Sequence, residues 1–163
     1  MKRLFTCLLL CLALLPPSAL ASDCPISRGS FLILLWRSWG GVPYDKTAHP
    51  FTDLLDDSKA QAAAWAYDRG LVKGVGNGLF APDRPLTREE CAALLRRNDA
   101  LLGRDTFLPD GASSCNEYQD ISPWADDSLY WACITDRMPW QDGQFAPLGL
   151  VGQKEAESYF DTL

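Results

Sequence analysis

Two short segments place an arginine directly after a hydroxyl residue, where a helix is expected to begin. They are Ser27-Arg28 and Thr87-Arg88. The free backbone N–H groups and the dipole of a helix N-terminus favour an anion, and a guanidinium adds a donor fork that fits a carboxylate. The pattern therefore predicts a carboxylate site at Arg88, repeated at Arg28. The alternative is that each arginine pairs with a carboxylate of the protein itself.

Glycines and aromatic residues extend this candidate site. Gly76 and Gly78 would let a ligand approach the backbone closely, because they carry no Cβ. Trp124, near a helix start, and Trp140, in a glycine-rich loop, are candidates for exposed stacking on a sugar ring. The other tryptophans considered have core-compatible helical spacing: Trp36, Trp39 and Trp65. The candidate ligand-binding residues are Arg88, Thr87, Arg28, Ser27, Gly76, Gly78 and Trp140.

Catalysis, metals and cofactors find little support. The chain has one histidine, His49, and no readable Ser-His-Asp or Cys-His arrangement. The pairs Asp56-Asp57 and Asp126-Asp127 lack the alternating ligands of a calcium loop, and charge at helix N-termini explains them. A glycosidase pair of carboxylates depends on proximity in space, so spacing along the chain does not address it. We expect no enzyme, no metal and no cofactor.

The first 21 residues have the pattern of a secretory signal peptide. Lys2 and Arg3 precede an apolar stretch over residues 4–15, and residues 19–21 read Ala-Leu-Ala, which is typical of a cleavage site. The alternatives are a buried N-terminal helix and a lipoprotein signal. We expect an exported protein, periplasmic or at the cell surface or extracellular, with no membrane span once the signal is removed.

Charge disfavours a nucleic-acid partner. The net charge of the whole chain is −6, whereas binders of the phosphate backbone are normally basic. Without the signal, 13 basic residues face 21 acidic ones, and the net charge becomes −8. An overall negative field also opposes an acidic ligand, so such a ligand would need a locally positive pocket.

The expected export of the protein bears on the state of its cysteines. Removing the signal leaves Cys24, Cys91, Cys115 and Cys133. An even number in an oxidising compartment suggests two disulfides, for which three connectivities are possible. We expect Cys115–Cys133, which leaves Cys24–Cys91. The alternative is free buried thiols.

An internal repeat organises the rest of the chain. Residues 51–97 align with 118–163 with small gaps, and residues 25–40 match 85–100 without gaps. Each full unit reads as helix, glycine-rich loop and helix. The chain then divides into a signal peptide (1–21), a partial repeat with linker (22–49), a full repeat (50–103), an inserted loop (104–117) and a degenerate repeat (118–163).

The expected fold class is all-α, because no alternating strand pattern of convincing length is present. We expect five helices, over residues 26–39, 58–70, 87–101, 123–136 and 152–161. Capping signals mark their ends: Ser58 with Gln61, Thr87 with Glu90, Gly70 followed by Leu71, and Ser122-Pro123. Phe80 is the expected core anchor of the middle unit.

The middle unit resembles the S-layer homology (SLH) family. That family's unit opens with aromatic-x-Asp, has a glycine-rich loop ending in Gly-x-Phe-x-Pro, and continues with a helix opening Ile-Thr-Arg-Ala-Glu. The matching residues are Phe51, Asp53, Gly70, Gly74, Gly78, Phe80, Pro82, Leu86, Thr87, Arg88, Glu89 and Glu90. The resemblance implies helix–loop–helix units packed as a pseudo-threefold bundle. It also implies non-covalent binding of cell-wall polysaccharide or a peptidoglycan-linked polymer, often pyruvylated.

The flanking units depart from the family pattern. The first lacks its leading helix, and the last has Gln153 where the arginine stands. Two functions follow as hypotheses. The first is an exported module that binds a cell-envelope glycan. The second is an interaction module of the same fold, without glycan affinity, whose partner is another envelope protein.

Overall fold

A computed structural model describes residues 23–108 and 120–160, and this part of the chain is helical without a strand. The helices are α1 (Arg28–Ser38), α2 (Asp57–Asp68), α3 (Arg88–Leu101), α4 (Asp126–Ile134) and α5 (Gln153–Ser158). The all-α class and the five expected helices are confirmed. None of the described helices is long and apolar enough to cross a membrane. The expected signal peptide lies outside the described residues.

Side-chain caps set the starts of α1, α2 and α3, whereas the N-cap residues of α4 and α5 provide no such cap. Thr87 caps α3 and forms the predicted capping box with Glu90. The predicted cap at Ser58 is wrong, because Asp56 accepts the hydrogen bond from the N–H of Lys59 instead. A carboxylate at this position also complements the positive end of the helix dipole. The N-cap of α2 is therefore two residues earlier in the chain than the predicted Ser58.

The predicted end of α2 is confirmed, whereas the predicted start of α4 is wrong. Gly70 follows α2 with a φ of 69°, and the N–H of Leu71 donates to the carbonyl of Ala66, as the glycine signal predicted. Leu71 is fully buried. Helix α4 begins at Asp126 rather than at Pro123, which belongs to a turn preceding the helix.

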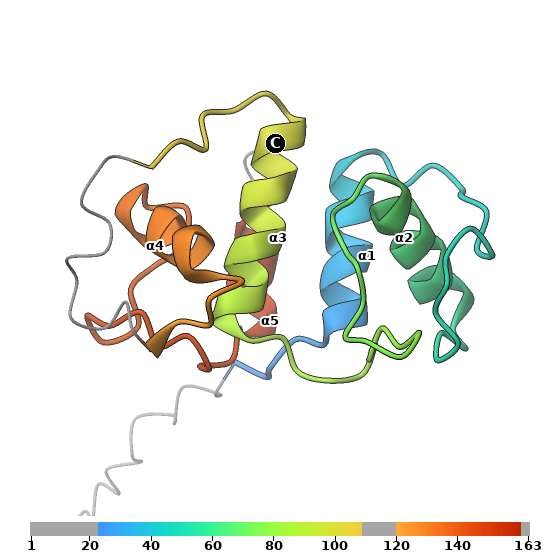
Figure 1. Cartoon of the computed structure of the whole chain (residues 1–163), viewed down its shortest axis with the longest axis horizontal. Coiled ribbons are helices and arrows are strands. Elements are labelled where there is room, and N and C mark those ends of the chain that lie inside the picture. The colour runs from blue at the N-terminus through green and yellow to red at the C-terminus, as the bar shows by residue number, and fades with distance from the viewer. Residues whose placement is uncertain (1–22, 109–119, 161–163) are drawn as a thin grey trace, which may run out of the picture.

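Three backbone hydrogen bonds join the segments that precede α1, α3 and α5. Ile26 N–H donates to Val151 O, Leu86 N–H donates to Ile26 O, and Val151 N–H donates to Leu86 O, at 2.9, 2.9 and 3.1 Å. Each of these buried residues stands directly before a helix N-cap. The three chain segments thus satisfy one another's backbone groups in a closed cycle. The cycle holds these helix starts at one end of the molecule (Figure 1).

Helices pack in two pairs, α1 against α2 and α3 against α4 (Figure 1). Phe80, the predicted anchor, is buried, and Phe145 occupies the equivalent buried position in the last unit. Among the tryptophans expected in the core, Trp65 is buried and Trp36 is partly buried. Trp39 is 37% exposed, because it lies at the end of α1, where its indole N–H donates to Asn98 Oδ1.

Asp23 caps α5 from the far end of the sequence. Its carboxylate accepts hydrogen bonds from the N–H groups of Lys154 and Glu155. The N-cap of α5 is Gly152, and a Cβ built there would lie 2.1 Å from Asp23 Oδ2. Glycine is required because the carboxylate comes from another segment. The backbone hydrogen bond from Lys154 is the largest influence on Asp23 and lowers its pKa.

The described cysteines form no disulfide. Cys24 is an exposed free thiol, whereas Cys91 and Cys133 are buried free thiols. The expected Cys24–Cys91 pair is not formed, because Cys91 faces the core from α3. Burial raises the pKa of the Cys91 and Cys133 thiols, so both behave as small apolar side chains. Cys115 lies outside the described residues, and its expected partner Cys133 is free here.

Candidate functional site

A pocket of about 510 Å³ lies between the start of α1, the glycine-rich loop of the middle unit and one face of α3. Trp124 and Leu148 of the last unit complete its lining. The pocket is therefore lined by residues from all three segments that align with one another in the sequence. The lining residues are Arg28, Val72, Lys73, Gly74, Val75, Phe80, Arg84, Thr87, Glu89, Glu90, Ala93, Leu94, Arg97, Trp124 and Leu148.

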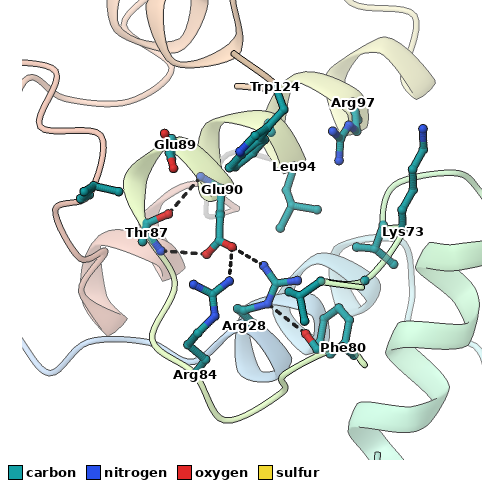
Figure 2. Close-up of a pocket in the computed structure, with 15 residues that line it drawn as sticks. Arg28, Lys73, Phe80, Arg84, Thr87, Glu89, Glu90, Leu94, Arg97 and Trp124 are labelled. Carbon is teal, nitrogen blue, oxygen red and sulfur yellow. Dashed lines mark hydrogen bonds and ion pairs between the residues drawn. The ribbon is translucent and has the colours of Figure 1, made fainter. Parts of the chain in front are cut away.

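Glu90 is the centre of a polar cluster on one side of the pocket (Figure 2). Its carboxylate accepts from Arg28 Nη1 at 2.8 Å, from the backbone N–H of Thr87 at 3.2 Å, and from Arg84 Nη2. Arg28 Nε also donates to the carbonyl of Phe80, and its guanidinium lies 4.9 Å from the centre of that ring. One carboxylate thus compensates two arginines.

Two further cations lie on the side of the pocket away from Glu90 (Figure 2). Arg97 Nη1 donates to the carbonyl of Leu71, and partial burial lowers the pKa of Arg97. Neither Lys73 nor Arg97 makes an ion pair with any residue in the described parts of the chain. The lining carries four cations against two carboxylates, so the pocket is locally positive in an acidic protein.

Apolar and aromatic groups form the rest of the pocket. Trp124 is 54% exposed, so its indole is available at the rim. Val75 and Leu148 are also exposed, while Leu94 is buried in the wall. Charged donors beside an exposed indole form a surface that suits a sugar carrying an acidic substituent. The C–H groups of the sugar ring can pack on the indole, and the oxygen atoms of the substituent can accept hydrogen bonds from the charged donors.

The loop conformation depends on Asp53 and Gly74. Burial opposes ionisation of Asp53, but hydrogen bonds from the N–H groups of Phe80 and Ala81 outweigh it and lower the pKa of this carboxyl group. Gly74 has a φ of 82°, and a Cβ there would lie 2.5 Å from the carbonyl oxygen of Leu79. The aromatic-x-Asp motif and this glycine therefore shape the wall of the pocket.

The predicted residues separate into two groups. Arg28 and Thr87 line the pocket, and Ser27 caps α1 beside it by accepting from the N–H of Ser30. Gly76 and Gly78 form the outer turn of the loop and are not among the lining residues. Trp140 stacks on the Phe145 ring at 4.7 Å between centroids, outside the pocket lining.

Arg88 also lies outside the pocket lining and is only 2% exposed. Its Nε donates to Phe145 O at 2.9 Å and its Nη2 to Pro139 O at 2.6 Å, while Nη1 lies 3.4 Å from Glu155 Oε1. Its backbone N–H donates to the carbonyl of Gly149. Carbonyl groups of the protein thus occupy the donors that we expected to face a ligand, and ligand binding by Arg88 stays a prediction.

Sequence reasoning missed Lys73, Arg84, Arg97 and Glu89. Lys73 and Arg84 flank the glycine-rich loop on either side, so their charges were a signal that could have been followed. Arg97 lies in the third turn of α3, and only the packing of the middle loop against that helix brings it into the same pocket as Lys73. Trp124 was considered for stacking and lines the pocket.

Two comparisons with known proteins bear on this site. An endoglucanase of Bacillus sp. (strain KSM-635) is 30% identical over 139 residues. The alignment covers 85% of this chain and 15% of the endoglucanase, so the chain spans a small part of that relative's length. Residues 50–92 match the S-layer homology domain. Such domains are binding modules of cell-envelope proteins and generally anchor them to the cell wall. Residues 50–92 thus match the S-layer homology family that the motifs of the middle unit predicted.

Proposed function

We propose that this protein is a non-catalytic module that binds an acidic glycan of the cell envelope in the pocket between α1 and α3. The observation that carries the proposal is the pair of cations without ion-pair partners in the described residues, Lys73 and Arg97, beside the exposed indole of Trp124. A carboxylate on the glycan would bridge the two cations. Arg28 and Arg84 would shape the opposite wall, because Glu90 already engages both.

The arrangement of the repeats forms part of this proposal. We infer that the three units pack around a pseudo-threefold axis through the closed cycle of Ile26, Leu86 and Val151. The cyclic direction of the three hydrogen bonds supports this inference, since each segment donates to one neighbour and accepts from the other. The equivalent bonds of Arg28 and Arg88 to Phe80 and Phe145 carbonyls support it too. The middle unit then supplies most of the pocket.

The proposed location is outside the cytoplasm, in the periplasm or at the cell surface. The signal-peptide pattern of residues 1–21 and the family of residues 50–92 support it. Mass spectrometry of the protein recovered from a cell envelope fraction tests this location. We expect an N-terminus at Ser22, whereas an intact Met1 terminus would contradict cleavage.

Binding is tested by sedimentation with purified bacterial cell-wall fragments that retain their polysaccharide. We expect the wild type to sediment and the Lys73→Ala/Arg97→Ala variant to bind at least tenfold more weakly, because both proposed carboxylate contacts are removed. Lys46→Ala is the matched control for loss of a positive charge, since Lys46 is exposed and pairs with Asp57 away from the pocket.

The outcomes separate the two functional hypotheses. Wild-type protein that stays in the supernatant contradicts glycan binding and leaves a protein partner as the function of the fold. Sedimentation that the double variant does not weaken contradicts the assigned pocket. Release of reducing sugar from the fragments by the wild type, above a sample without protein, contradicts the non-catalytic assignment.

A further inference from the structure

We infer that Glu89 is a positioning residue, which holds the turn carrying Trp124 so that the indole forms a stacking wall for a sugar ring of the glycan. This inference rests on the proposed function. It adds a stacking contact to the charge contacts of Lys73 and Arg97. It also gives a role to the buried carboxylate of Glu89, which takes no part in the proposed contacts of Lys73 and Arg97 with the glycan.

The link between Glu89 and the turn is direct. Glu89 is 4% exposed, and its two carboxylate oxygens accept hydrogen bonds from the backbone N–H and from Oγ of Ser122, both at 3.1 Å. The carbonyl of Ser122 in turn accepts from the N–H of Ala125. Trp124 stands inside the turn that this last bond closes. The carboxylate therefore anchors α3 to the turn on both of its oxygens.

The anchored turn presents its indole to the pocket. Trp124 lines the pocket together with Leu94 and Arg97 of α3, and Figure 2 shows the indole beside these two side chains. An indole that is more than half exposed at a pocket rim offers an apolar face to the C–H groups of a sugar ring. Helix α4 starts after the turn without a side-chain cap at Ala125, so Glu89 supplies a restraint that capping does not.

The position of Glu89 is specific to the middle unit. The equivalent residues after the other two helix starts are Gly29 in α1 and Lys154 in α5. Neither residue has a carboxylate, so neither can hold a neighbouring turn in this way. The stacking wall is therefore confined to the pocket that also carries Lys73 and Arg97.

The test is a double-mutant cycle with the same cell-wall fragments as probe. We expect Trp124→Ala to weaken binding roughly fivefold, as loss of one aromatic contact does. Glu89→Ala should weaken it by a similar factor in the wild type and by less than twofold in the Trp124→Ala background, because Glu89 acts through Trp124. Glu89→Gln should bind within twofold of wild type, since the amide still accepts from the N–H of Ser122 and exchanges a hydrogen bond with its hydroxyl.

Two further measurements separate positioning from general stability. Thermal unfolding of each variant shows whether it folds, and Glu157→Ala is the control for loss of a carboxylate, as Glu157 is exposed on α5. Fluorine NMR of protein labelled with 5-fluorotryptophan reports the Trp124 signal, assigned with Trp124→Phe. Glu89→Ala should shift or broaden that signal, and Glu89→Gln should leave it in place.

Each result decides one claim. Absence of wild-type binding overturns the proposed function itself. Binding that Lys73→Ala/Arg97→Ala abolishes and Trp124→Ala leaves unchanged keeps the proposed function and overturns the stacking wall. Loss of binding in Trp124→Ala with no loss in Glu89→Ala, an unmoved Trp124 signal, or losses that add in the double variant overturn the role of Glu89.

Discussion

Arg28 and Arg88 occupy equivalent positions in two repeats, yet their surroundings differ. Each donates from Nε to a phenylalanine carbonyl. Each also donates from Nη1 to a glutamate in the first turn of a later helix, Glu90 of α3 for Arg28 and Glu155 of α5 for Arg88. Arg28 borders an open pocket beside Arg84. Arg88 is closed in. The same local motif therefore serves a pocket in one unit and a buried clamp in the other.

The two arginines differ in which residues surround their guanidinium groups. In the last unit, the carbonyl of Pro139 accepts from Arg88 Nη2, and the Sγ atom of Cys133 lies 3.8 Å from the same nitrogen. In the middle unit, the corresponding region carries Lys73 and opens toward solvent. A hydrogen-bond pattern that two segments share thus does not determine whether its arginine borders a pocket.

Replacing each arginine by alanine should change the stability of the protein more than any other variant proposed for this comparison. We expect Arg88→Ala to lower the free energy of unfolding by about 3–5 kcal/mol, because it removes the hydrogen bonds of a buried guanidinium to the Phe145 and Pro139 carbonyls and its ion pair with Glu155. Arg28→Ala should cost about 1–3 kcal/mol, since Arg84 still pairs with Glu90. Urea denaturation measures both values. Equal losses would contradict the distinction between clamp and pocket.

Alkylation of Cys133 sharpens the same distinction. The thiol is buried against Arg88 in the wild type, and burial raises its pKa, so it should react slowly. Arg88→Ala should increase its rate with iodoacetamide more than tenfold, whereas Arg28→Ala should leave the rate within twofold. Peptide mapping after timed quenching gives the rate for each cysteine, and exposed Cys24 serves as the internal reference.

Low pH should reduce the stability that Asp53 gives to the loop at the pocket. Its pKa is lowered in the folded protein, so its contribution to stability is complete above the unfolded value near 4 and is lost as pH falls through the folded value. Asp53→Asn should cost roughly 1 kcal/mol at pH 7 and less at pH 3. Melting temperatures at the two pH values measure this change. A variant that costs the same at both values would contradict the assignment.

Raising the salt concentration should have the smallest of these effects, because salt weakens the interactions of exposed charges more than those of buried charges. Lys73 and Arg97 border an open pocket, so raising NaCl from about 0.05 to 0.5 M should weaken cell-wall binding about threefold to tenfold. The cost of Arg88→Ala in free energy of unfolding should not change by more than about 0.5 kcal/mol over that range, because the Arg88 side chain is buried. Sedimentation and urea denaturation measure the two quantities.

Much of the fold was predictable because its signals are local. The five helices, the capping box of Thr87 with Glu90 and the turn at Gly70 depend on residues within one or two helical turns of one another. The Ser58 cap failed because Asp56 offered a better acceptor two residues earlier. The Cys24–Cys91 pairing failed because a count of cysteines says nothing of which thiols face the core.

The candidate site was predictable only in part. From the sequence alone we predicted the repeated segments, the resemblance of residues 50–92 to the S-layer homology family, the five helices, and an arginine at the start of two of them. The packing of distant segments determines which arginine borders the pocket, because Pro139 and Cys133 contact Arg88, whereas Arg28 lines the pocket together with Lys73 and Arg97. Helix periodicity and capping depend on near neighbours, whereas access to an arginine depends on the packing of distant segments.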